Sequence, residues 1–109
     1  MKIAMSAAAS GLLRALLARA AIPRDRILLT DLRSTDWQSL TFIGERHEIE
    51  LRIPGPDAPE IGSRITSGLD HAEFKIPGQI VADVALIEEP LAQDDGSLML
   101  KIEALTIVQ

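Results

Sequence analysis

SLMLKIEALTIVQ, residues 97–109, is the stretch that decides the fold of this chain. Alternate residues form one set that is almost wholly apolar and a second set in which Lys101 and Glu103 are mixed with apolar residues. A period of two is the signature of a β-strand with one buried face. Just upstream, the apolar run IVADVALI at residues 80–87 predicts a partner strand, connected through an acidic loop that ends in Asp94-Asp95-Gly96. The chain is therefore predicted to end in a long β-hairpin.

Two further segments place apolar residues at helical spacing. Residues 6–21 are rich in alanine and leucine, and Pro23 ends the helix that they predict because proline cannot continue it. Residues 57–68 begin with Asp57, which can accept a hydrogen bond from the first free amides, and a glutamate follows three residues later as in a capping box. Gly68 marks the expected end of this second helix. Its apolar seam consists of Ile61, Ile65 and Leu69.

The remaining segments predict strands. Residues 27–30 and 37–43 form the first two, with a polar break at residues 33–36, and Gly44-Glu45 is a turn signal before a third strand. In that third strand apolar and charged positions alternate, so one side faces a core and the other faces water. A short strand is expected at residues 72–76. The apolar set of the third strand is His47, Ile49, Leu51 and Ile53.

These elements follow one another in the order α-β-β-β-α-β-β-β. Strands joined by short turns pair antiparallel, and helices cover the apolar face of such a sheet. We therefore predict an α+β fold, with a mostly antiparallel sheet of five or six strands and two helices packed on one face. The length of 109 residues corresponds to a single domain over residues 1–109.

The amino-acid composition argues against several classes of function. The net charge of -5 argues against nucleic acid as a partner, because affinity for phosphates comes from clustered Lys and Arg. The absence of cysteine excludes disulfides, thiolate metal sites and cysteine nucleophiles. No run approaches the roughly 20 apolar residues that span a bilayer, so we expect a soluble cytoplasmic protein that does not bind membranes. The few aromatic residues offer little surface for a planar cofactor, and we predict none.

Three residues are candidates for catalysis. Asp83 is a carboxylate in an otherwise apolar strand, where it is costly unless it faces solvent or a partner such as Lys101 across the hairpin. His47 and His71 each lie next to a carboxylate in the sequence. Their spacing is not that of a helical metal-binding pair, so we predict no metal site and place His47 in the core. Neither a nucleophile motif nor a phosphate-binding loop accompanies them.

The two closing strands are partly apolar on both sides. By alternation, Val81 and Ile87 share a side with Asp83, while Leu105 and Ile107 share a side with Lys101 and Glu103. Monomers seldom leave a large apolar patch open to water. We therefore expect a second copy of the chain or another protein to cover part of this surface. The predicted interface consists of Val81, Ile87, Leu105 and Ile107.

Two functional hypotheses remain. The first is a non-enzymatic module that self-associates or docks a partner through its sheet, and the absence of any catalytic motif favours it. The second is a small-molecule-binding or hydrolytic protein with a pocket between sheet and helices, using Asp83 and a histidine. The second hypothesis requires these residues to converge within hydrogen-bonding reach.

Overall fold

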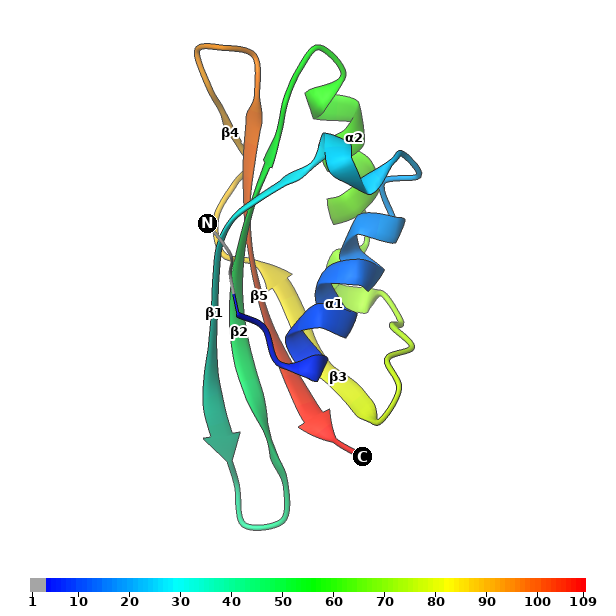
Figure 1. Ribbon diagram of the computed structural model, residues 1–109, viewed down its shortest axis with the longest axis vertical. Helices are drawn as coiled ribbons and strands as arrows, with labels where there is room; N and C mark the ends of the chain where they lie inside the picture. The colour runs from blue at the N-terminus through cyan, green and yellow to red at the C-terminus, as the bar shows by residue number, and fades with distance from the viewer. Residues whose placement is uncertain (1–3) are drawn as a thin grey trace.

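The computed structural model describes residues 4–109 as two helices packed on one side of a five-stranded antiparallel sheet (Figure 1). The α+β class, the antiparallel sheet and the two helices on one face are confirmed. The strand order is β1-β2-β5-β3, and the short β4 pairs with β5 beyond the end of β3. The closing stretch of sequence is thus a central strand. The strands are β1 (Leu28–Gln38), β2 (Ile43–Ile53), β3 (Gln79–Leu86), β4 (Leu91–Ala92) and β5 (Leu98–Val108).

The helices lie close to their predicted positions. Helix α1 spans Ala7–Ala18 and α2 spans Ala58–Thr66. Asp57 precedes α2, but its side chain makes no capping hydrogen bond, so the predicted capping box is not formed. Gly68 follows α2 with φ 64°, the left-handed conformation that glycine adopts without a steric penalty. Two short 3-10 turns complete the helical elements, Arg24–Arg26 and Leu69–His71.

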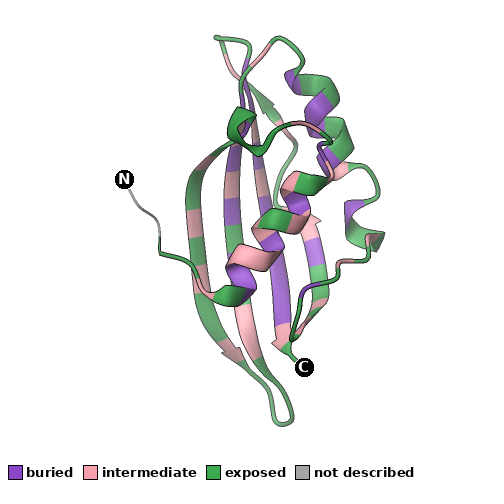
Figure 2. Cartoon of the chain, turned by 45° about the vertical axis from the view of Figure 1, so that its right-hand side comes forward, coloured by how far each residue is buried: buried purple, intermediate pink, exposed green. Residues whose placement is uncertain are grey.

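The core lies between the helices and the sheet (Figure 2). The predicted alternation of β2 and the predicted seam of α2 are both confirmed, because these residues are buried. Gly62 lets α2 approach the sheet closely: a side-chain carbon there would lie 2.5 Å from Leu98 Cδ2. Burial of apolar surface is the main stabilising term of such a fold. The largest fully buried apolar side chains are Leu12, Leu16, Ile49, Leu51, Ile53, Ile61, Ile65, Leu100 and Ile102.

A β-bulge in β3 changes the direction of a predicted interface residue. The pairing of β3 with β5 shifts between Val81 and Asp83, so Val81 lies opposite Thr106 whereas Asp83 lies opposite Leu105. Directly opposite residues share a face, and a bulge inserts one residue that breaks strict alternation. Val81 therefore packs against the edge of the core on the helix side. The expectation that Val81 and Asp83 share a side is wrong.

The first predicted strands have different boundaries. Strand β1 runs through the predicted break at residues 33–36, because the backbone pairs with β2 along this whole segment. The turn lies instead within the predicted strand 37–43. There the Ser39 amide donates to the Phe42 carbonyl at 2.8 Å, and the Phe42 amide donates to Ser39 Oγ at 3.1 Å. Gly44 belongs to β2 rather than to a turn.

The predicted strand at residues 72–76 is not part of the sheet. Residues 72–78, which we call the strap, run beside α1 and contribute one isolated bridge, between Ile76 and Gln79. Ile76 fits over Gly11 of α1, where an added side-chain carbon would lie 2.6 Å from Ile76 Cγ2. The Arg19 guanidinium lies 5.9 Å from the centre of the Phe74 ring. Contacts with α1 and the residue that follows it thus replace sheet pairing here.

Neither α1 nor α2, nor any other helix within residues 4–109, combines the length and the apolar character that crossing a membrane requires.

Candidate functional site

His47 lies fully buried in β2, in the core position that the sequence predicts. Its Nδ1 is 2.7 Å from Ser34 Oγ of β1, and its Nε2 is 2.8 Å from Thr106 Oγ1 of β5. Burial lowers the pKa of His47 below its usual value, and the nearby Glu45 carboxylate opposes this shift. Both ring nitrogens have hydroxyl partners, so a neutral imidazole is stable at this position.

The three catalytic candidates do not come together. His47 faces the helices, whereas Asp83 lies opposite Leu105 on the other face of the sheet and is exposed. His71 is exposed in the second 3-10 turn, with its Nε2 3.6 Å from a carboxylate oxygen of Asp70. Convergence of these residues, which a hydrolytic mechanism would need, is not seen.

Two ion pairs involve other charged side chains of the sheet, Lys101 with Glu88 and Arg52 with Asp95. The Lys101 ammonium lies 3.0 Å from Glu88 Oε1, and so Glu88 takes the place that Asp83 was expected to fill. Asp95 accepts hydrogen bonds from Ser97, which lower the pKa of the Asp95 carboxyl, and it pairs with Arg52. Within residues 4–109, no group of three His, Asp or Glu side chains is arranged to hold a metal ion.

The sheet face that points away from the helices, called the open face, is charged in its middle. In the β1–β2–β5 pairing, Arg33 lies opposite Glu48, and Glu48 lies opposite Glu103. The next row places Glu50 opposite Lys101. Water solvates such a surface readily, so the centre of the open face does not need a covering partner.

The predicted interface residues lie in different surroundings. Val81 is at the core edge. Leu105 belongs to the open face but is only 9% exposed, and Ile107 beside it is half-buried. Ile87 is 45% exposed and lies near the Lys101–Glu88 ion pair. These four residues therefore do not form one continuous apolar patch.

A different apolar surface lies where the β1–β2 hairpin projects. The hairpin extends beyond both helices and beyond the C-terminal end of β5 (Figure 1). Its turn carries Leu40, which is fully exposed, and Phe42, which is 53% exposed. The strand pairing brings the start of β2, the end of β5 and the start of β3 to the same end of the sheet. The hairpin end, as we call it, comprises the exposed residues Leu40, Phe42, Ile43, Ile80 and Val108.

The hairpin end is apolar on both faces of the sheet. On the open face, Trp37 lies opposite Gly44, Gly44 lies opposite Ile107, and Ile107 lies opposite Ile80. On the helix side, Ile43 and Val108 are exposed. Within residues 4–109, no other segment of the chain covers these exposed side chains.

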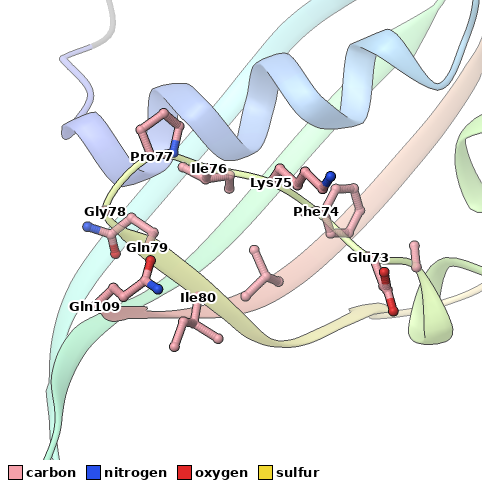
Figure 3. Close-up of a pocket in the computed structure, with 11 residues that line it drawn as sticks. Glu73, Phe74, Lys75, Ile76, Pro77, Gly78, Gln79, Ile80 and Gln109 are labelled. Carbon is pink, nitrogen blue, oxygen red and sulfur yellow. The ribbon is translucent and has the colours of Figure 1, made fainter.

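A hollow lies beside the hairpin end, between the strap and the start of β3. Its volume is about 610 Å³, and Phe74, Ile76, Pro77, Val81 and Gln79 are among its lining residues. Figure 3 shows the strap running above β3, with Gln79 and Gln109 near the turn at Gly78 and Glu73 at the opposite end. Its lining mixes apolar side chains with Glu73, Lys75, Gln79 and Gln109, and it is open to solvent.

The sequence did not single out the turn of the hairpin. Residues 37–43 contain no glycine, proline, asparagine or aspartate, so the usual turn signals are missing. Ser39 was the available signal, because its hydroxyl can bond a nearby amide and so favour a turn. The exposure of Leu40 and Phe42 became visible only in the structure.

Comparison with known proteins assigns no relative. No family model matches the chain, and neither a curated protein nor a solved structure is similar to it at a significant level.

Proposed function

We propose that this chain is a small non-enzymatic α+β module that self-associates, and that it does so through the hairpin end. The observation that carries this proposal is the fully exposed Leu40, together with Phe42 and Ile43, on a hairpin that projects beyond the helices. Contiguous exposed apolar residues on soluble proteins mark interaction sites. The scattered positions of His47, Asp83 and His71 favour this reading over a hydrolytic one.

The charged middle of the open face directs the contact to the hairpin end. A partner that covered the rows of Arg33, Glu48 and Glu50 would have to desolvate these charges, which is costly unless each charge is paired. A partner at the hairpin end would remove mostly apolar surface from water, and each Å² of that surface contributes about 25 cal/mol. Among the four residues of the predicted interface, Ile107 adjoins the hairpin end, because it lies opposite Gly44.

Light scattering after size-exclusion chromatography tests the proposal over a range of protein concentrations. We expect the wild type to reach twice the monomer mass of 11.8 kDa. The double variant Leu40→Ser with Phe42→Ser should remain monomeric with an unchanged circular dichroism spectrum, because neither side chain belongs to the core. The matched control is Leu91→Ser, which removes a 61% exposed leucine from the opposite end of the sheet and should still dimerise. A wild type that stays monomeric at high concentration contradicts the proposal.

A further inference from the structure

We infer that the hydrogen-bond chain from Ser34 through His47 to Thr106 is a pH-sensitive latch, which releases the end of β1, residues 33–38, from β2 when His47 takes up a proton. This inference concerns the single chain and does not rest on self-association. The latch crosses three strands on the helix side of the sheet, because Ser34 belongs to β1, His47 to β2 and Thr106 to β5. It therefore ties the edge strand to the interior of the sheet.

The hydrogen bonds of the latch have one consistent direction. Thr106 Oγ1 donates to the Glu45 carbonyl at 3.5 Å, so it can accept the proton of His47 Nε2 at 2.8 Å. His47 Nδ1 is then the acceptor, and the Ser34 hydroxyl donates to it at 2.7 Å. A second proton on the ring would occupy Nδ1 and reverse this last hydrogen bond. Within residues 4–109 the Ser34 hydroxyl has no other acceptor, so its hydrogen would lose its partner.

The charged groups around His47 do not compensate for a buried proton. Glu45 precedes His47 on the same side of β2, and Asp36 lies opposite Glu45 on β1. Helix α1 contacts β2, and its one charged residue, Arg14, is exposed. The helix-side positions of β5 and β3 are uncharged. Burial lowers the pKa of His47 more than Glu45 raises it, so the neutral ring is the form that the closed latch favours.

The end of β1 is the part of the sheet that can open around His47 at the lowest cost. Strand β1 is an edge of the sheet, and none of its residues is fully buried. Near its start, Leu29 and Leu32 pack against the core. Separation of residues 33–38 from β2 would therefore hydrate the ring while little apolar surface leaves the core. The helix-side residues of this end are all polar: Ser34, Asp36 and Gln38.

Hydrogen exchange, followed by mass spectrometry on dilute protein at pH 7.5 and pH 5.0, tests the latch. Protection factors correct the rates for the effect of pH on intrinsic exchange. We expect protection at residues 33–38 to fall by at most about thirtyfold, the factor by which proton binding at pH 5.0 favours an open ring with the ordinary pKa of 6.5. Protection at residues 98–108 should stay far higher at both pH values, because β5 is exposed only by global unfolding. Protonation of Asp36 and Glu45 would relieve their repulsion and so act in the opposite direction.

Two pairs of variants assign the change to the latch. His47→Gln, whose amide can bond both hydroxyls without titrating, should remove the pH dependence, whereas His71→Gln in the exposed 3-10 turn should retain it. Ser34→Ala should lower the protection at residues 33–38 about tenfold at pH 7.5, because a buried ring nitrogen loses its partner. Thr35→Ala, the neighbouring position on the open face, should leave the protection near its wild-type value.

Three results would overturn the inference. Protection at residues 33–38 that does not change with pH, or that changes equally in His47→Gln, would show that the opening is not linked to the ring. Protection there as high as at residues 98–108 would show that His47 is reached only by unfolding of the whole chain. Wild-type protection in Ser34→Ala would show that the opening leaves the contact between Ser34 and His47 intact.

Discussion

The middle of the sheet, which the helices cover, and the hairpin end are built from the same strands. They differ in how deeply their apolar side chains are buried. In the middle, Ile49 and Leu51 of β2 are buried beneath the helices. A few residues earlier in the same strand, Ile43 is 59% exposed. The local sequence is apolar in both places. Whether an apolar side chain becomes core or contact surface depends on where the helix layer stops.

The largest expected effect comes from truncating one side chain in each region. Leu51→Ala in the covered middle should lower the free energy of unfolding by about 3 kcal/mol, because the buried side chain leaves a cavity. Ile43→Ala at the hairpin end should cost less than about 1 kcal/mol, because the site is already open to water. Urea denaturation of dilute, monomeric protein measures both values. Equal losses of stability would show that Ile43 contributes to the core of the single chain. The two regions would then not differ in burial.

A smaller effect is expected at the border between the regions, where Gly44 allows β2 and β5 to approach closely. A side-chain carbon at Gly44 would lie 1.9 Å from the Thr106 carbonyl oxygen, which is backbone and cannot rotate away. We expect Gly44→Ala to separate the strands at the hairpin end, to cost about 2 kcal/mol, and to abolish dimerisation. Glu48→Ala, an exposed position in the same strand, should change stability by less than about 0.5 kcal/mol. A Gly44→Ala protein with wild-type stability would contradict this packing.

The smallest expected effect is the pH dependence that His47 adds. Because burial lowers its pKa below the ordinary value of 6.5, the unfolded chain binds a proton more readily than the folded chain as the pH falls through that value. The stability that the neutral ring provides is therefore present above pH 6.5 and is lost towards lower pH. The slope for one group is at most about 1.4 kcal/mol per pH unit.

Urea denaturation at pH 7.5 and pH 5.0 measures this loss, with His47→Gln as the control. The amide of glutamine can bond Ser34 and Thr106 without titrating, while every carboxylate is retained. We expect the wild type to lose more stability than the variant between the two pH values. Parallel losses in the two proteins would show that His47 is protonated equally in the folded and unfolded states.

Alternation and helical spacing were sufficient to predict the class of this fold. The buried set of β2 follows directly from the period of two, and the seam of α2 follows from residues one turn apart. Alternation failed at the bulge after Val81, because an inserted residue changes the pairing without changing the local composition. The residue pattern also gave a wrong prediction at the strap. Its sequence resembles a strand, but Phe74 and Ile76 contact the helical layer instead of pairing in the sheet.

The sequence predicted fewer features of the candidate site than of the fold. The sequence indicated correctly that the closing strands have apolar residues on two sides, and it placed His47 in the core. It pointed to Leu105 and Ile87 as contact residues, whereas the structure buries Leu105 and places Ile87 beside charged groups. Leu40 and Phe42 carried no signal of exposure, because a turn without glycine or proline resembles a strand.

By itself, the sequence determined the α+β class, the two helices on one face and the burial of His47, since these depend on the periodicity of side chains along one segment. Only the tertiary structure decided which apolar residues remain exposed. That outcome depends on how far α1 reaches across a sheet assembled from distant segments, and on bulges that reverse the side to which a residue points. The hairpin end is exposed because no helix extends over it.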